Sequence, residues 1–150
     1  MVQSGVATTL TRIQAAPARG AERVSLVRAD LHTEWGIAGD AYGGPGDRQV
    51  VLLDACARAA IDEGTGEQGV CYPRFRENLL IEDLNAGRLA PGMRLVIGTV
   101  VLEVTAAGKR CFPECTLPRG ECHIRAGVAF CRVIRGGSVQ VGDDVFVENA

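Results

Sequence analysis

Short apolar segments separated by close turns run through most of the chain. Residues 6–13 alternate loosely between apolar and polar positions, and residues 24–29 form a short apolar run that ends at Asp30. Residues 49–53 and 78–81 are apolar runs of the length that buried strands usually have. This spacing of apolar runs predicts a chain made mostly of short strands.

The second half of the chain continues the same pattern. Further strands are expected at residues 93–97, 100–105, 127–134, 139–141 and 144–147. The first two are separated by Gly98 and Thr99 alone, which is the length of a two-residue β-hairpin loop. Pro91-Gly92 marks a turn before them.

One segment has the signals of a helix. Asp54 is a good N-cap for a helix over residues 55–63, and Gly64 and Gly66 are expected to end it. Residues 36–46 contain five glycines, a density that requires tight turns. Together these patterns predict a mainly β fold: a closed or nearly closed β-barrel with one or a few short helices, forming a single domain over residues 1–150.

Composition narrows the class of protein. A chain of 150 residues can bury a core without disulfides, and its net charge of −2 with a pI near 5.7 argues against a nucleic-acid binder. No segment resembles a signal peptide or reaches the roughly 18 to 20 apolar residues of a membrane span. We therefore expect a cytoplasmic protein, whose thiols stay reduced and whose cysteine clusters serve catalysis or metal binding.

Three of the six cysteines lie close together. The segment GKRCFPECTLPRGECH, residues 108–123, places Cys111, Cys115 and Cys122 within twelve residues. Lys109 and Arg110 precede the first of them, and cationic neighbours stabilise a thiolate. A thiolate attacks a persulfide or binds a soft metal, so Cys111 is interpreted as the working thiol rather than as a buried apolar side chain.

The role of the other two cysteines has several interpretations. The spacing C-x3-C-x6-C, followed by His123, differs from the usual C-x2-C pair of a zinc site. It still supplies soft ligands for zinc or an iron–sulfur cluster through Cys111, Cys115, Cys122 and His123. Cys115 and Cys122 are alternatively resolving thiols for a persulfide on Cys111, or incidental. These alternatives stay open at this point.

The glycine-dense segment is a second candidate site. Its residues of interest are Gly39, Asp40, Gly43, Gly44, Asp47 and Arg48. Their backbone amides are expected to form a nest for an anionic group, with Arg48 holding a phosphate through two hydrogen bonds. The alternative is a turn-rich connection in which the aspartates cap the backbone and Arg48 pairs internally.

Other polar and thiol side chains have simpler expected roles. In the FREN segment, Asn78 is expected to fix a loop through hydrogen bonds to the backbone. Arg76 and Glu77 are expected to face one common cleft. Cys131, within VAFCRV, and Cys56, on the expected helix, are both expected in the core.

Five blocks of sequence, in order, resemble the MOSC domain family. They are GIAGDAYGGPGDRQVVLLD (36–54), FRENLLIEDL (75–84), PGMRLVIGTVVLEVT (91–105), the cysteine after GKR, and GVAFCRVIRGGSVQVGDDV (127–145). This module is found at the C-terminus of molybdenum cofactor sulfurases and in mitochondrial amidoxime-reducing proteins. The resemblance covers residues 24–147, so we expect a small stand-alone MOSC protein of the bacterial type.

The resemblance implies a β-barrel related in shape to the small barrel of pyruvate kinase. It also implies one cysteine that carries sulfur or ligates the molybdenum of a pterin cofactor, and Cys111 is the matching position. The family often has proline just before this cysteine, where this chain has Lys109 and Arg110.

The expected cofactor is therefore molybdenum cofactor (molybdopterin). The residues expected to hold it are Gly39, Asp40, Gly43, Gly44, Asp47, Arg48, Arg76, Asn78, Lys109 and Arg110. The expected partners are a sulfur donor such as a cysteine desulfurase, or a molybdoenzyme, with no nucleic acid and no membrane. The sequence does not specify the oligomeric state.

Overall fold

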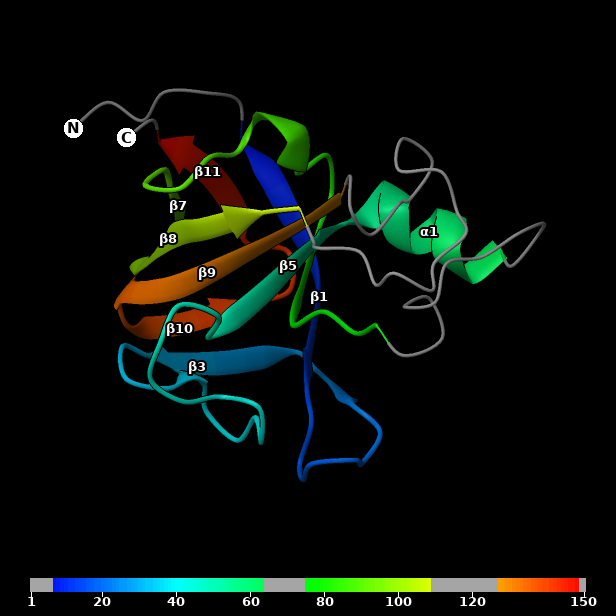
Figure 1. Cartoon of the computed structure of the whole chain (residues 1–150), viewed down its shortest axis with the longest axis vertical. Helices are drawn as coiled ribbons and strands as arrows, with labels where there is room; N and C mark the ends of the chain where they lie inside the picture. The colour runs from blue at the N-terminus through cyan, green and yellow to red at the C-terminus, as the bar shows by residue number, and fades with distance from the viewer. Residues whose placement is uncertain (1–6, 64–74, 109–126, 149–150) are drawn as a thin grey trace.

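The computed structural model describes residues 7–63, 75–108 and 127–148. In chain order the strands are β1 (Thr8–Ala15), β2 (Val24–Leu26), β3 (Arg28–His32), β4 (Gly36–Ile37), β5 (Val50–Asp54), β6 (Leu79–Ile81), β7 (Arg94–Ile97), β8 (Val100–Ala107), β9 (Val128–Arg135), β10 (Gly137–Gln140) and β11 (Asp144–Glu148). The described helices are α1 (Ala55–Glu63) and the 3₁₀ helix η1 (Ala86–Arg88). Figure 1 shows α1 standing to one side of the strands.

Seven strands close into a barrel. Their order is β11-β7-β8-β9-β5-β6-β1, and β1 pairs again with β11 through Thr8↔Val145 and Thr9↔Asp144. All of these pairings are antiparallel except β5–β6, which is parallel because α1 lies on the connection between the two strands. The mainly β, closed-barrel fold expected from the strand pattern is confirmed.

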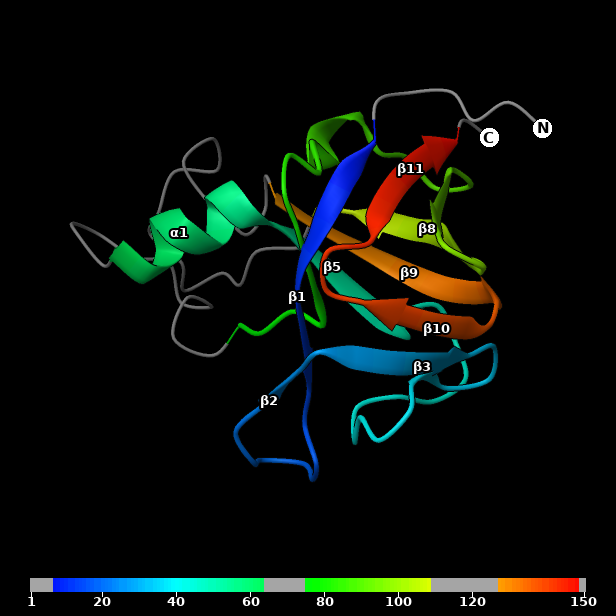
Figure 2. The ribbon, with the colours of Figure 1, turned by 180° about the vertical axis from the view of Figure 1, so that it is seen from behind.

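The remaining strands extend the barrel at one end. β2 pairs with β1, whereas β3 pairs with β10 and β4 in a separate three-stranded sheet (Figures 1 and 2). The apolar run over residues 24–29 is thus divided between two strands. The division falls at Val27, which is 73% exposed and accepts a hydrogen bond from the amide of Val141 at 2.9 Å.

The core fills the inside of the barrel. Its largest fully buried members are Leu10, Ile13, Leu31, Ile37, Leu52, Leu79, Ile81, Leu95, Ile97 and Leu102. Leu53, next to Leu52 on β5, points the other way into a second apolar cluster between the barrel and α1. The second cluster also contains Phe75 and Phe130, so both faces of this part of the sheet are covered.

The helix predicted over residues 55–63 is confirmed, and Asp54 caps it. Asp54 Oδ1 accepts a hydrogen bond from the amide of Cys56 at 3.0 Å. The prediction that Cys56 belongs to the core is wrong. Ala57 and Ile61 face the barrel, and Cys56 lies on the exposed side of the same helix.

The hairpin predicted at Gly98-Thr99 is also confirmed, because Ile97 pairs directly with Val100. Within the described residues, no helix is long and apolar enough to cross a membrane.

Candidate functional site

The segment that contains the clustered cysteines lies between β8 and β9 in the chain. Gly108 follows β8, and its amide donates to the carbonyl of Val128, the first residue of β9, at 2.9 Å. The described strands therefore hold the two ends of the segment side by side. Six predicted site residues lie outside the described part of the chain: Lys109, Arg110, Cys111, Cys115, Cys122 and His123.

Arg48 lies against strands β8 and β9. Its guanidinium carbon is 4.2 Å from the centroid of the Phe130 ring, a cation–π contact. Phe130 is three residues after Gly127, so strand geometry puts it within about 10 Å of Gly127, where the described chain resumes after the cysteine segment. The Arg48 side chain is exposed, and no hydrogen bond or ion pair joins it to another described side chain.

A bulge in β8 secures the backbone beside Arg48. The pairing of β8 with β9 shifts between Val104 and Ala106, which leaves Thr105 as the extra residue. The Thr105 hydroxyl lies within hydrogen-bond distance of the Asp47 carbonyl and 3.1 Å from the carbonyl of Phe130. Because a hydroxyl donates only one hydrogen bond, Thr105 donates to one of these two carbonyls at a time. Its hydrogen bond to the Asp47 carbonyl holds the backbone next to Arg48 against β8.

The glycine-dense segment packs around an indole ring. The amide of Gly43 donates to the Asp40 carbonyl at 3.1 Å, and that of Gly44 donates to the Trp35 carbonyl at 2.8 Å. A Cβ at Gly43 would lie 2.2 Å from Trp35 Nε1, so only glycine fits there. The Gly43 and Gly44 amides are thus engaged inside the loop. Gly39, whose φ is +85°, forms the preceding turn.

Asp40 and Asn78 form a buried polar pair that joins this loop to the barrel. Asn78 Nδ2 donates to Asp40 Oδ2 at 3.0 Å and to the Gln14 carbonyl at 3.2 Å, while Asn78 Oδ1 accepts from the amide of Val51 at 2.9 Å. Asp40 Oδ1 accepts from the amide of Ala16 at 3.1 Å. The predicted backbone-fixing role of Asn78 matches these contacts. A buried network whose members are all paired specifies one arrangement of the loop.

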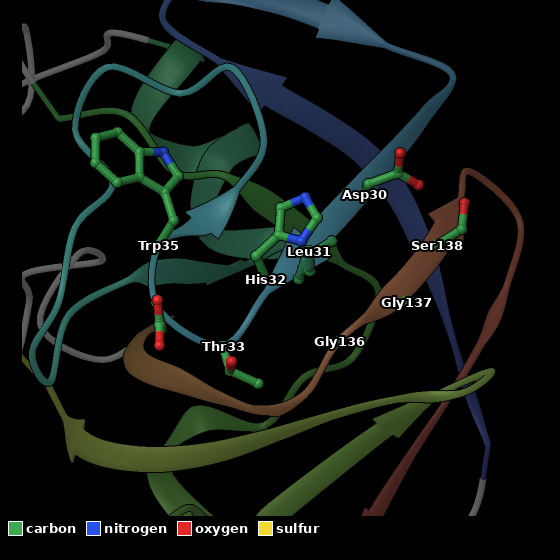
Figure 3. Close-up of a pocket in the computed structure, with 9 residues that line it drawn as sticks. Asp30, Leu31, His32, Thr33, Trp35, Gly136, Gly137 and Ser138 are labelled. Atoms are coloured by element: carbon green, nitrogen blue, oxygen red, sulfur yellow. The ribbon is translucent and has the colours of Figure 1, made fainter.

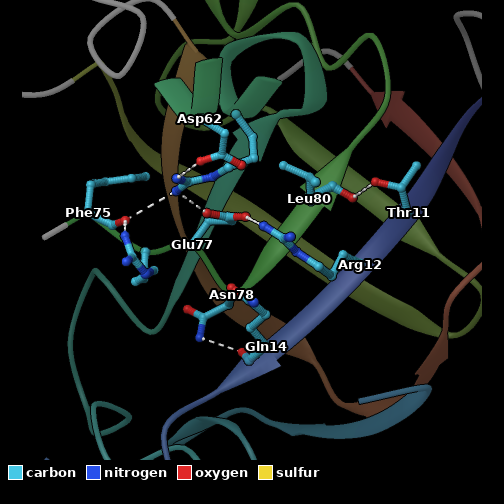
Figure 4. A network of polar contacts seen from close by, with 10 residues as sticks. Thr11, Arg12, Gln14, Asp62, Phe75, Glu77, Asn78 and Leu80 are labelled. Carbon is cyan, nitrogen blue, oxygen red and sulfur yellow. Dashed lines mark hydrogen bonds and ion pairs between the residues drawn. The ribbon is translucent and has the colours of Figure 1, made fainter. Parts of the chain in front are cut away.

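Arg76 and Glu77 point into different surroundings. Glu77 is fully buried, and its two carboxylate oxygens bind Arg12 at 2.8 Å and Arg58 at 2.6 Å. Figure 4 shows Glu77 between Arg12 and the region of Phe75. Arg76 is exposed and donates to the Phe75 carbonyl at 2.7 Å. The expectation that Arg76 and Glu77 face one cleft is therefore wrong, because adjacent residues in an extended segment point to opposite sides.

The charges around Glu77 decide its ionisation. Burial alone would raise the pKa of its carboxyl, but the hydrogen bond from Arg12 and the charge and hydrogen bond of Arg58 lower that pKa below the ordinary 4.5. Glu77 is thus a carboxylate at neutral pH.

Cys131 is a buried thiol in the wall of the barrel. Cys131 is fully buried within β9, and burial raises the pKa of its thiol above the ordinary 9.0. Its predicted place in the core is confirmed. Within residues 7–63, 75–108 and 127–148, no group of three or more His, Cys, Asp or Glu side chains is placed to hold a metal ion.

The structure therefore brings some predicted site residues together and separates others. Asp40 and Asn78 are hydrogen-bonded to each other. The Arg48 side chain instead contacts Phe130 of β9, and the Arg76 side chain donates to the Phe75 carbonyl. Sequence reasoning missed Thr105 and Phe130 as neighbours of Arg48. Thr105 ends an apolar run as the only hydroxyl in it, which is a weak signal for a bulge.

Chemically, the described part of the site offers an exposed guanidinium in cation–π contact with an aromatic ring. A guanidinium carries its N–H donors in one plane, the geometry that binds a phosphate or carboxylate through two hydrogen bonds. The ring belongs to β9, the strand that follows the cysteine segment in the chain.

The chain matches a known protein family. The family model described as MOSC domain matches residues 30–146. A search of the curated proteins found no match.

The fold is similar to that of the YuaD protein from Bacillus subtilis, with a TM-score of 0.73 and 17% identity over 99% of this chain and 100% of that one. It is also similar to YiiM from Geobacillus stearothermophilus (TM-score 0.63, 15% identity, 95% of this chain and 75% of that chain). For YiiM from Escherichia coli the TM-score is 0.62 and the identity 17%, over 97% of this chain and 71% of that chain. These likenesses show the fold, and the family model spans most of the sequence, so the chain belongs to the MOSC domain family.

Proposed function

We propose that this MOSC-family protein carries sulfane sulfur as a persulfide on Cys111, or binds molybdenum cofactor through the same thiol. The observation that carries the proposal is that the family match spans the cysteine segment, whose two ends are held side by side by β8 and β9. Lys109, Arg110 and Arg48 supply positive charge on and beside that segment. Positive charge stabilises the thiolate form that this chemistry requires.

The sulfur step is an exchange between two thiols. The Cys111 thiolate attacks the outer sulfur of a donor persulfide, a new S–S bond forms on Cys111, and the donor leaves as a thiolate. The donor is a protein persulfide, such as that of a cysteine desulfurase. No net oxidation or reduction occurs, because one persulfide replaces another.

The described residues fit an anionic cofactor in one respect. Arg48 presents an exposed guanidinium in cation–π contact with Phe130, and in this proposal it holds the cofactor's phosphate. The Gly43 and Gly44 amides already have backbone acceptors, so the proposal does not use them as phosphate ligands. Bound cofactor would supply molybdenum for redox or sulfur chemistry, with Cys111 as its protein ligand.

Replacing Cys111 with serine tests the proposal. The variant is incubated with a cysteine desulfurase and labelled cysteine, and protein-bound sulfur and bound pterin are both measured. We expect the loss of sulfur loading for Cys111→Ser and normal loading for Cys56→Ser, which removes an exposed thiol on α1. Intact sulfur loading together with intact cofactor binding in Cys111→Ser would contradict the proposal.

Thr105 and Arg48 test the cofactor branch separately. Arg48→Ala is expected to weaken pterin binding by about tenfold, since a charge-assisted contact contributes roughly 1.5 kcal/mol or more. Thr105→Val removes the hydroxyl that ties Asp47, whereas Thr105→Ser keeps it. Weaker binding in the valine variant with recovery in the serine variant supports the placement of Arg48, and equal binding in all three proteins contradicts it.

A second candidate function is a metal-binding module. The observation in its favour is the set of three cysteines and one histidine within residues 111–123. Anaerobic purification followed by metal analysis and an absorption spectrum separates the two functions. Stoichiometric zinc or iron favours the module, and metal-free, colourless protein excludes it.

A further inference from the structure

A hollow lies outside the barrel, between the β3–β4 connection and the turn that joins β9 to β10 (Figure 3). Its volume is about 860 Å³. One wall is bare backbone, because a Cβ at Gly136 would lie 2.6 Å from the Leu31 carbonyl oxygen and one at Gly137 would lie 2.4 Å from Thr99 Oγ1. Glycine at both positions therefore lets this turn pack closely on Leu31 and Thr99.

An immobilised indole forms part of the opposite side. Trp35 Nε1 donates to the Asp40 carbonyl at 2.9 Å, and the backbone of Gly43 packs directly on the ring. Even so, 41% of Trp35 is exposed, and it lines the hollow. A large apolar side chain that is fixed by its neighbours and still open on one side is preorganised to stack on a ligand.

The charged residues that line the hollow are both acidic. They are Asp30 and Glu34, and neither carboxylate forms an ion pair or hydrogen bond with another side chain of the described residues. Figure 3 shows Asp30 beside Ser138, with His32 between them and Trp35. Two cations are neighbours of lining residues without lining the hollow themselves: Arg28, which donates to Ser138 Oγ at 2.7 Å, and Arg135, which precedes Gly136 in the chain. Among the described residues that line the hollow, two are carboxylates and none is Arg or Lys.

We propose that this hollow binds an organic cation, namely a guanidinium or ammonium group of a small molecule or of an arginine or lysine side chain. Tryptophan is the best aromatic partner for such a cation, and the two carboxylates neutralise its charge. The hollow is larger than a guanidinium group and open to solvent, so the carrier of the cation can extend out of it. The proposal does not depend on the chemistry proposed for Cys111.

Trp35 makes the proposal directly testable, because it is the only tryptophan of the chain. N-acetyl-arginine amide is titrated into the full-length protein while tryptophan fluorescence is followed, and N-acetyl-citrulline amide serves as the neutral isostere. We expect saturable quenching by the arginine compound and at least fivefold weaker binding of the citrulline compound. Equal binding of both compounds, or no saturable response to either, would overturn the proposal.

Variants then assign the contacts. Glu34→Gln and Asp30→Asn are each expected to weaken binding about threefold, as for a partly exposed ion pair. Glu82→Gln, an exposed carboxylate elsewhere on the barrel, and Cys111→Ser are expected to bind like the parent protein. Unchanged affinity in the double variant of Asp30 and Glu34 would also overturn the proposal.

A last comparison identifies the source of the cation. Agmatine is titrated in parallel with the tripeptide Gly-Arg-Gly, both at the same ionic strength. Equal affinities identify the free cation as sufficient and favour a small-molecule ligand. Tighter binding of the tripeptide favours a basic segment of a protein partner, and failure of both contradicts the proposal.

Discussion

Replacing Glu77 with glutamine removes a buried negative charge while the side chain keeps its shape. Glu77 is fully buried between Arg12 and Arg58, at 2.8 and 2.6 Å. Arg58 is itself only 8% exposed, so it loses its buried counter-charge without gaining water and keeps only the exposed carboxylate of Asp62. Removing one partner from a buried ion pair typically costs about 3 kcal/mol or more. Arg58 keeps its contacts with Asp62 and the Phe75 carbonyl, so we expect Glu77→Gln to lower the free energy of unfolding by about 3 kcal/mol, the low end of that range.

The chain offers a matched control, a partly buried glutamate whose arginine partners are exposed. Glu103 also lies between two arginines, Arg132 at 2.7 Å and Arg94 at 3.6 Å. Those arginines are 48% and 47% exposed, so water replaces the lost charge in Glu103→Gln and the cost stays below about 1 kcal/mol. The two variants therefore change the same chemical group at the same kind of triad and differ mainly in burial.

Urea denaturation at pH 7, followed by circular dichroism, measures both variants. For a chain of this length, 3 kcal/mol corresponds to a melting temperature lower by roughly 6 to 12 °C. Equal losses of stability in Glu77→Gln and Glu103→Gln, with unchanged denaturant dependence, would refute the reasoning from burial.

The pH dependence gives an independent check on Glu77. The pKa of Glu77 is lower in the folded protein than the ordinary 4.5, so its charge stabilises the fold above that value. This contribution is lost as the pH falls from about 4.5 through the lower pKa of the folded state. The stability difference between the parent protein and Glu77→Gln is therefore expected to shrink below pH 4.5, and a difference that grows there would contradict the assignment.

Two further predictions concern packing and thiol burial. Gly43→Ala forces a methyl group into the ring of Trp35, so we expect it to lower the free energy of unfolding by about 1 to 3 kcal/mol and to shift the tryptophan emission. Gly87→Ala is the control, because a Cβ at Gly87 meets nothing within 4 Å, and it is expected to be neutral in the same denaturation assay. Alkylation with peptide mapping is expected to label Cys56 in native protein and Cys131 only in urea, because Cys131 is buried and its thiol pKa is raised; labelling of Cys131 in native protein would contradict that burial.

Local signals in the sequence were sufficient for several elements. Asp54 and the following residues predict α1 with its observed bounds, because an N-cap and the helix it starts are neighbours in the chain. Gly98-Thr99 predicts its hairpin for the same reason. Many short strands with close turns indicate closure into a barrel, although which strands pair is not written in any one segment.

The parts that were wrong or missed depend on contacts between distant segments. Exposure of Cys56 follows from which side of α1 meets the barrel, and the helix is too short and alanine-rich for its sequence to show this. Thr105 reaches the Asp47 carbonyl 58 residues earlier in the chain, and Glu77 pairs with Arg12 across 65 residues. Such pairings depend on the register of the closed barrel, which single-sequence patterns do not encode.

The candidate site is divided in the same way. The cysteine segment was found from spacing and charge, and its position between β8 and β9 agrees with the strands that flank it. Arg48 was singled out, but its cation–π contact with Phe130 could not be inferred from residues 82 positions apart. The assignment of Asp40 and Asn78 to a cofactor stays a prediction, and their observed contacts join the glycine-dense loop to the barrel.

Intact-protein and peptide mass spectrometry of the natively purified protein tests the central claim most directly. The claim predicts that the peptide containing Cys111 carries one additional sulfur atom, about 32 Da, that a reductant removes, or else that the intact protein retains a pterin which Cys111→Ser lacks. A Cys111 thiol that stays unmodified after exposure to a persulfide donor, in protein that also binds no pterin, would contradict it.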